Sequence, residues 1–393
     1  MNQNFHLQAM EGFVCTGSQC PRSCCSENWV IGIDAATLEK WQHLGEEDRQ
    51  YLLDMVVAPE SQPQQMGKNP NKSCVALNRD KLCDIQLRFG HDFIPEVCRT
   101  FPRSVVQNEQ RCVSTGSFSC PEIVQRFFSS GTQTVFSRSV EPSEKSDAST
   151  LLLNQAADVL DVILSQKKLP LGVMLFYITD VFNDIFSLYH AGQLQPQALQ
   201  SLEDNLGANL QDIVSLVNRG EIRPDSVTAG SFWRSIYSML TTADIHTKYL
   251  SEPGSKLKQL MESPESHENY QKIYQHISFM RKNARKSMKL LNPMLRPYLK
   301  AYFTNLGFPF APKYSHEITL VNGMLNLAVL QIMLWNQNET HGTVGKQTFK
   351  ECITEMDRRL VQNSNVAMQL QSDSHMLQVE KYCLCFIDLF SGA

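Results

Sequence analysis

The sequence predicts a mainly α protein in which a cysteine-rich metal-binding N-terminal module packs on a helical C-terminal domain. Three observations support this prediction: nine of the twelve cysteines lie at or before Cys120, apolar residues recur at helical spacing beyond residue 150, and a polar stretch separates the two regions. The chain of 393 residues is also longer than a single core usually supports. We therefore predict a cysteine-rich module over 1–136, a linker over 137–150 and a helical domain over 151–393.

The composition is that of an ordinary globular protein, with 42% hydrophobic residues, 19% charged residues and a net charge of -4. Such a balance provides no overall positive field for nucleic acid. The N-terminal residues lack the basic and apolar regions of a secretory signal, and the apolar stretch 171–192 contains Asp180 and Asp184, which are costly in hydrocarbon. We expect a cytoplasmic protein with neither nucleic acid nor membrane as partner, and a buried helix at 171–192.

Helices are expected wherever apolar residues recur every three or four positions, as they do from Leu151 to Ile163. Further helices are expected at 199–217, 230–250, 264–291, 317–335, 345–364 and 374–390. The segment "WVIGID" (29–34) is the only predicted strand. Asp34 follows it and is expected to cap the N-terminus of the next helix, because Asp is a preferred residue at that position.

The front cysteines form two blocks, "CTGSQCPRSCC" and a more widely spaced group around residues 74–98. Short spacings allow one turn to offer two sulfurs, and distant cysteines close the coordination shell. A neighbouring cation favours the thiolate, which is the ligand form, and Arg22, Arg99 and Arg103 are near in sequence. The predicted metal ligands are Cys15, Cys20, Cys24, Cys25, Cys74, Cys83, Cys98 and Cys120.

The spacing leaves two metal assignments open, because thiolates suit both zinc and iron-sulfur clusters. Structural disulfides are disfavoured in a reducing cytoplasm. The preferred first ligands are Cys20, Cys24, Cys83 and Cys98, which combine one short-spaced pair with two distant thiols. In contrast, Cys352, Cys383 and Cys385 lie in apolar sequence and are expected to be buried core residues.

A family resemblance rests on the cysteine pattern and the residues around it. The run Phe13-x-Cys15-x4-Cys20-x3-Cys24-Cys25, followed by Trp29-x-Ile31-x-Ile33-Asp34, resembles the opening of the flagellin lysine-N-methylase family. "CVALNRDKLCDIQLRFGHDFIPEVCRTFPR" (74–103) resembles the second cysteine block of that family, and "SCPE" (119–122) resembles the third. The same cysteine style occurs in CxxxCxxCC domains that chelate zinc or iron. Cys112 matches no position of the family pattern.

The resemblance implies a bacterial enzyme that transfers methyl groups from S-adenosylmethionine to lysine side chains of flagellin, with a cysteine-bound 4Fe-4S iron-sulfur cluster. No G-x-G-x-x-G loop is present, so a Rossmann methyltransferase is not expected. The sequence assigns neither the catalytic residues nor those that bind the methyl donor. The alternative function is non-enzymatic, namely a cysteine-rich zinc-binding interaction protein.

One segment of the helical domain, residues 269–316, contains no Asp or Glu but nine Lys and Arg residues, interleaved with Tyr and Phe. Two interpretations are open. The segment could form a basic, aromatic surface that docks an acidic partner protein or nucleic acid, and flagellin would be the protein partner. Alternatively, the charges lie on solvated helix faces whose buried stripe comprises Ile273, Ile277, Met280, Met288 and Leu291.

Overall fold

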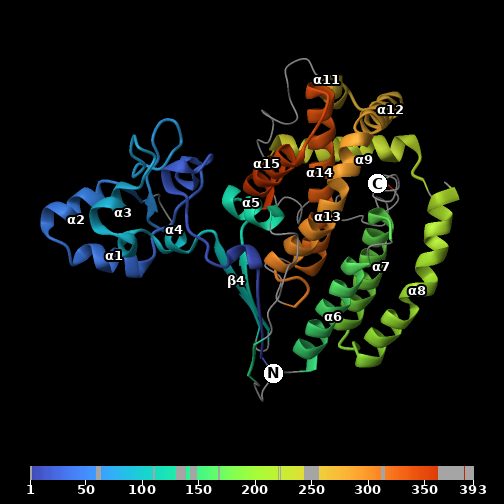
Figure 1. The fold of residues 1–393 in the computed structure, drawn as a ribbon, viewed down its shortest axis with the longest axis horizontal. Helices are drawn as coiled ribbons and strands as arrows, with labels where there is room; N and C mark the ends of the chain where they lie inside the picture. Colours follow the sequence, from blue (N-terminus) through green and yellow to red (C-terminus); the bar gives the residue numbers. More distant parts are fainter. Residues whose placement is uncertain are drawn as a thin grey trace.

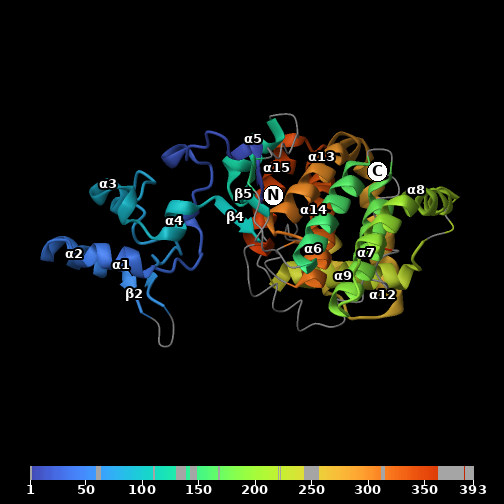
Figure 2. The ribbon, with the colours of Figure 1, turned by 90° about the horizontal axis from the view of Figure 1, so that it is seen from below.

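The fold is mainly α, as the sequence predicts. It is known from a computed structural model that describes residues 2–58, 63–108, 111–129, 139–141, 148–166, 169–219, 221, 223–242, 256–310, 315–361 and 385. A smaller N-terminal lobe projects from a larger helical body, and a narrow sheet lies where the two meet (Figure 1). A view turned by 90° shows the same separation of the lobe from the body (Figure 2).

The helical body contains the long helices of the chain. Its described helices are α5 (Pro121–Ser129), α6 (Ala148–Ser165), α7 (Leu171–His190), α8 (Pro196–Arg219), α9 (Ser226–Thr242), α11 (Lys256–Glu262), α12 (His267–Asn283), α13 (Arg285–Asn305), α14 (His316–His341) and α15 (Lys346–Met356). A π-helical segment, η5 (Asp357–Val361), continues directly from α15. These helices enclose the main hydrophobic core, in which α14 lies deepest: its residues from Leu327 to Leu330 are completely buried.

Most predicted helices are confirmed, but their boundaries differ. The expected helix at 264–291 is two helices, because α12 ends at Asn283 and α13 then continues through Pro293 and Pro297 to Asn305. The predicted helix at 230–250 is described only as α9, and α11 was not predicted. The predicted helix at 374–390 lies outside the described residues except for Cys385, which is buried.

Helix α7 is the apolar stretch that the sequence assigns to the interior. Among the described helices it is long and apolar enough to cross a membrane, but 67% of its most apolar window is buried inside the fold. Its neighbours are helices of the same body, α6, α8 and α14. Phe182 and Phe186 also pack against Phe308, in the turn after α13, with ring centroids 5.2 and 5.6 Å away respectively. The helix therefore serves as a core element, as predicted.

The prediction of a single strand at 29–34 is wrong. That segment is extended but forms only the isolated bridge between Gly32 and Gln65. The described residues form two short sheets instead: β2 (Val56–Val57) pairs with β3 (Gln65–Met66), and a second sheet has the order β4-β5-β1-β6. The strands of the second sheet are β1 (Asn2–His6), β4 (Arg103–Gln107), β5 (Arg111–Gly116) and β6 (Ser139–Glu141).

The second sheet escapes sequence analysis because its strands lack a clear apolar alternation. β4 is exposed at most of its positions, and β5 begins with polar residues. The pairing itself is non-local, since β1 runs parallel to β5 with Phe5 opposite Val113. Parallel pairing between such distant segments leaves no turn signal in the sequence.

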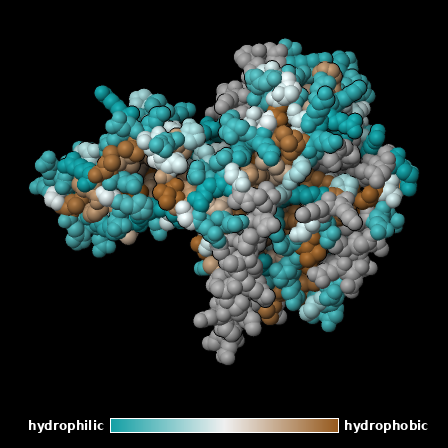
Figure 3. Space-filling model, viewed as in Figure 1, coloured by the Kyte–Doolittle hydropathy of each residue, from teal (hydrophilic) through white to brown (hydrophobic). Residues whose placement is uncertain are grey.

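The smaller lobe holds its own apolar core. Its helices are α1 (Ala35–Gln42), α2 (Glu46–Leu53), α3 (Asp84–Phe89) and α4 (Glu96–Thr100). Its core residues are Ile33, Trp41, Leu52, Met66, Cys74, Ala76, Ile85 and Ile94. The surface of this lobe shows hydrophobic patches between hydrophilic ones (Figure 3). Leu87 is 61% exposed and Val97 is 47% exposed.

The boundary between the core of the small lobe and the core of the helical body does not fall at the expected linker at 137–150. Leu7, Phe13, Phe118 and Phe127 all belong to the core of the helical body, although they precede that linker. The reason is that α5 packs against α15 and β5 against α13. Within the expected linker, β6 pairs with β1 and α6 begins at Ala148.

Asp34 caps α1, as the sequence predicts. Its carboxylate accepts hydrogen bonds from the Thr37 N–H at 2.9 Å and from the Thr37 hydroxyl at 2.7 Å. It also accepts the Glu96 N–H at 2.8 Å, so one side chain caps α1 and contacts the first residue of α4. Although desolvation opposes the change, these hydrogen bonds lower the pKa of Asp34 to about 2. The carboxylate is therefore engaged in structure.

Gly230 allows α9 and α12 to approach closely, because a Cβ at this position would overlap the backbone carbonyl of Tyr270. Backbone atoms cannot move aside as a flexible side chain can. We therefore expect Gly230→Ala to destabilise the protein by about 1–3 kcal/mol, as overpacking does, although alanine is the better helix former. Thermal unfolding measures the change. Gly345→Ala is the control, since its added methyl meets open space, and equal stability of the two variants would contradict the prediction.

Candidate functional site

The first cysteine block is a loop of two tight turns. The segments η2 (Gly17–Gln19) and η3 (Cys24–Ser26) are single 3-10 turns. Gly17 adopts a φ of +56°, in the left-handed region, and its N–H donates to the Cys15 sulfur at 3.4 Å. The Ser23 hydroxyl accepts the Cys25 N–H at 3.2 Å and caps the second turn. The sequence thus folds locally so that several thiols share one short loop.

The second block joins the first through the backbone. The Cys74 N–H donates to the Cys25 carbonyl at 2.8 Å. Cys74 is a member of the small lobe's core, and Cys25, Cys83 and Cys98 pack against that core. Cys83 precedes α3 at its N-cap position, while Cys98 lies within α4. The structure therefore brings together thiols that lie up to 73 positions apart in the sequence.

The pKa values of these thiols reflect their proximity. A hydrogen bond between the Cys24 and Cys25 side chains lowers the pKa of Cys24 to about 7, against the effect of burial and with help from Arg358. The same hydrogen bond raises the pKa of Cys25. Burial raises the pKa of Cys98 to about 12, and the neighbouring thiols Cys24, Cys74 and Cys83 add to that rise. We call Cys24, Cys25, Cys74, Cys83 and Cys98 the lobe thiols.

The remaining predicted ligands, Cys15, Cys20 and Cys120, influence one another near the helical body. Cys120 belongs to the core of the body. Burial raises its pKa to about 11, and the thiols of Cys20 and Cys15 contribute to that shift. Of the preferred ligands Cys20, Cys24, Cys83 and Cys98, the last three are lobe thiols, and Cys20 acts on the thiol of Cys120. Cys112 lies in β5, opposite Asn4 and Gln107.

All eight predicted ligands are free cysteines. Among the described residues, however, no group of three or more His, Cys, Asp or Glu side chains converges closely enough to hold a metal ion. The lobe thiols are near enough to influence one another's ionisation, but their sulfurs are not arranged as a coordination shell. Cys352 and Cys385 are buried in the core of the body, as predicted, and Cys383 lies outside the described residues.

The cation that acts on Cys24 is Arg358, which the sequence analysis missed. Of the arginines it proposed, Arg22 pairs with Glu27 at 2.8 Å and Arg99 donates to the Asp92 carbonyl at 3.0 Å. Arg103 donates to the Phe13 carbonyl at 3.1 Å. Arg358 lies in the run "EMDRRL", where four charged residues interrupt an apolar helical pattern. This unusual cluster of charges is the sequence signal that could have revealed Arg358.

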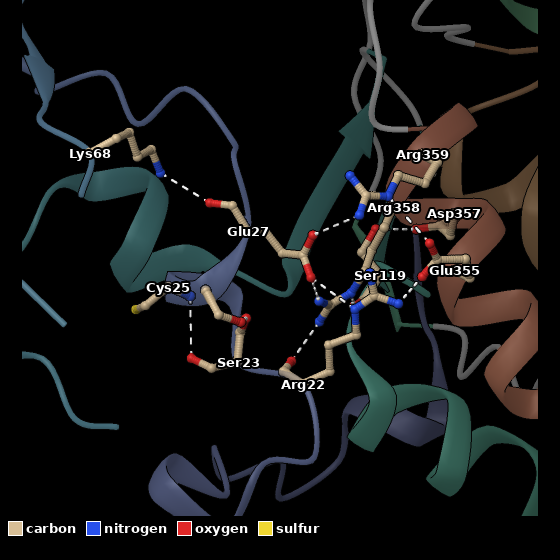
Figure 4. Close-up of polar contacts among 11 residues, drawn as sticks. Arg22, Ser23, Cys25, Glu27, Lys68, Ser119, Glu355, Asp357, Arg358 and Arg359 are labelled. Carbon is tan, nitrogen blue, oxygen red and sulfur yellow. Dashed lines mark hydrogen bonds and ion pairs between the residues drawn. The ribbon is translucent and has the colours of Figure 1, made fainter. Parts of the chain in front are cut away.

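Arg358 organises a buried polar network between the cysteine loop and η5 (Figure 4). Its guanidinium is bonded on all sides: Nε donates to the Ser119 carbonyl at 2.6 Å, Nη1 to Glu27 Oε1 at 2.6 Å and Nη2 to the Arg22 carbonyl at 2.7 Å. It also lies over the ring of Trp29, 5.4 Å from the centroid. Arg358 is 2% exposed and Glu27 is 6% exposed, so this ion pair is buried.

Further charged groups complete the network around that pair. Arg22 contacts Glu355 as well as Glu27, and Arg359 lies 3.7 Å from Glu27 Oε2. The Ser119 hydroxyl donates to Asp357 Oδ2 at 2.6 Å. Although burial opposes it, the three arginines lower the pKa of Glu27. The network has carboxylates and guanidiniums in contact throughout, so its first role is to fix the cysteine loop against the body.

Comparison with known proteins identifies the class. The chain is 31% identical over 123 residues to flagellar biosynthetic protein FliU of Salmonella muenchen, covering 29% of this chain and 70% of that protein. It is also 31% identical over 123 residues to the lysine-N-methylases of Salmonella typhimurium and Salmonella choleraesuis, covering 29% of each. No protein-family model matches the chain, and no solved structure matches it.

A mainly α fold with a cysteine-rich lobe thus accompanies similarity to proteins of flagellar biosynthesis and lysine methylation. The chain belongs to the flagellin lysine-N-methylase family, as the cysteine pattern predicts. The match spans less than a third of the two curated lysine-N-methylases.

Glu27→Gln tests the buried network. The change leaves Arg358 without its buried counter-ion, so we expect the free energy of unfolding to fall by about 3–5 kcal/mol, measured by urea denaturation at pH 7. The exposed Glu47 provides the control, because Glu47→Gln removes the same charge from the surface. A loss no greater than that of the control would contradict a structural role for the pair.

The pH dependence of the same two proteins gives a second readout. Because the pKa of Glu27 is lowered in the fold, its stabilisation is present above the unfolded-state pKa, about 4.3, and is lost as the pH falls through the folded-state value. The stability difference between the wild type and Glu27→Gln should therefore narrow in acid.

Proposed function

We propose that this protein is a cytoplasmic methyltransferase that transfers methyl groups from S-adenosylmethionine to lysine side chains of flagellin. The observation that carries the proposal is the 31% identity to curated lysine-N-methylases, together with the matching FliU similarity. In this reaction the neutral lysine amine forms a bond to the donor's methyl carbon. The carbon–sulfur bond of the donor breaks, leaving S-adenosylhomocysteine, and one proton leaves the nitrogen.

Deprotonating the acceptor is the main chemical requirement on the protein. A lysine amine has a reference pKa of about 10.4, so presenting it neutral at pH 7 costs roughly 4–5 kcal/mol. Burial of the lysine in the complex or a nearby base must offset that cost. No residue of this chain is assigned to that task.

The proposal includes a metal held by the lobe thiols. The chemistry of this donor set fits a thiophilic metal, because free cysteines that are distant in sequence surround one small core. Cys24, Cys25, Cys74, Cys83 and Cys98 are the residues that would hold it. When bound, an iron-sulfur cluster supplies electron transfer or an open iron position, whereas four-coordinate zinc supplies structural stability.

A methylation assay tests the activity. Purified protein incubated with labelled S-adenosylmethionine and flagellin should transfer label to flagellin lysines. Flagellin whose lysine amines have been chemically blocked is the control and should remain unlabelled. If a metal-replete preparation transfers no label to unmodified flagellin, the proposed enzymatic activity is contradicted. The alternative function, a zinc-binding interaction protein, would then be favoured.

Metal analysis tests the thiols separately. If one cubane cluster is bound, anaerobically purified protein should contain about four iron and four sulfide per chain. Cys98→Ser should lower the iron content, because it removes a lobe thiol. The buried Cys352 provides a matched control, and Cys352→Ser should leave iron unchanged. If protein that methylates flagellin contains stoichiometric zinc and no sulfide, the iron-sulfur assignment is wrong. The proposed methylase activity would still stand.

A further inference from the structure

The turn between α12 and α13 carries exposed cations that lack carboxylate partners. Lys282, Arg285, Lys286 and Lys289 are exposed, and we call them the basic corner. Within the described part of the chain, none of the four takes part in an ion pair. Other cations of the acid-free segment are satisfied internally: Lys272 binds Glu268 at 2.6 Å and Lys300 binds Asp161 at 2.8 Å. Among the described residues of the segment, the exposed cations without a carboxylate partner thus lie at this one turn, and Lys313 lies outside the described residues.

The basic corner is electrostatically unfavourable for the isolated protein. Arg285 and Lys289 are four residues apart on α13, so like charges face each other at the spacing of helix neighbours. Arg285 and Lys286 also occupy the first turn of α13, where the helix dipole disfavours positive charge and no acidic residue compensates. An anionic partner bound here would relieve both repulsions.

Two large apolar side chains border these cations. Phe279 is 53% exposed and Leu290 is 52% exposed. Phe279 lies three residues before Lys282 and Leu290 lies four residues after Lys286, which places each apolar residue beside a cation on the helix surface. Buried apolar contacts surrounded by charged groups are typical of protein interfaces.

The partner that fits this surface is a polypeptide rather than nucleic acid. Single-stranded nucleic acid is usually held on stacked aromatic rings, but Tyr298, Tyr302 and Phe303 are buried in the body. Only Phe279 remains as an exposed ring within the segment's described aromatics. The chain as a whole carries a net charge of -4, so it has no overall field that attracts nucleic acid, and the basic corner is a local cluster of positive charge.

We propose that the basic corner, with Phe279 and Leu290, docks an acidic polypeptide segment that also carries apolar side chains, and that this segment belongs to the flagellin substrate. The inference rests on the proposed function and extends it. A basic surface repels the cationic side chain of the target lysine, so the corner is a docking surface apart from the place of methyl transfer. Docking there raises the local concentration of the acceptor lysine without taking part in the chemistry.

The test measures binding of flagellin to the full chain at low and high salt. The patch variant is Lys282→Gln, Arg285→Gln, Lys286→Gln and Lys289→Gln. The matched control is Arg79→Gln, Lys81→Gln, Arg223→Gln and Lys346→Gln, which removes as many positive charges from scattered exposed positions. We expect the patch variant to bind about tenfold more weakly at low salt, with the difference largely lost at ~1 M salt because charges are then screened. The control should bind as the wild type does.

The apolar part of the docking surface has its own readout. Phe279→Ala combined with Leu290→Ala should weaken binding at both salt concentrations, because burial of apolar surface is not screened by salt. Both residues are exposed, so circular dichroism should show an unchanged fold. A loss that vanishes at high salt would contradict the apolar contribution.

Each remaining outcome separates docking from catalysis. Unchanged affinity of the patch variant for flagellin, or an equal loss of affinity in the patch and control variants, would overturn the docking surface. Methylation of flagellin by the wild type would still support the proposed enzyme. A patch variant that loses affinity for duplex DNA but not for flagellin would also overturn it. Conversely, patch-dependent binding without any methyl transfer by the wild type would overturn the enzyme and retain the docking surface.

Discussion

The arrangement of this protein depends on one buried ion pair, between Arg358 and Glu27. A buried guanidinium is stable only when its charge and its N–H groups are satisfied, and here carbonyls and a carboxylate from distant segments satisfy them. Breaking such a pair by removing one partner costs far more than the intact pair contributes. The pair therefore acts as a constraint: η5, the cysteine loop and the segment before Cys120 must meet at this point for any of them to be correctly placed.

From this constraint the positions of the thiols follow. Glu27 comes directly after the turn that carries Cys24 and Cys25, and its carbonyl accepts the Lys68 amine at 3.1 Å. Arg358 holds one side of this turn, and the Cys25 carbonyl binds Cys74 on the other. The carbonyl of Ser119, next to Cys120, is bound by the same guanidinium. Arg358 thus lies next to both the turn that carries Cys24 and the segment that carries Cys120, and one side chain helps to place both.

Local features were predictable from the sequence and non-local ones were not. The buried stripe of α12 and α13, the Asp34 cap and the burial of Cys352 depend on spacing within one element. The parallel pairing of β1 with β5 and the contact of Arg358 with Glu27 join segments far apart, for which one sequence carries no signal. Proximity in sequence also gave a wrong prediction of the cations that favour the thiolates. Arg99 and Arg103 donate hydrogen bonds to backbone carbonyls instead.

The buried network is poorly suited to accept the proton of a substrate lysine. Glu27 is surrounded by guanidiniums that lower its pKa, which makes it a weak base. Glu355 contacts Arg22 and Arg359, and Asp357 accepts hydrogen bonds from Ser117 and Ser119. Tyr298 lies near Asp357, but burial first and then that carboxylate raise its pKa, so it stays protonated. These groups are matched in charge among themselves, and a cationic lysine brought next to them would add an unbalanced charge. The network therefore holds the cysteine loop in place, and deprotonation of the acceptor depends on groups outside it.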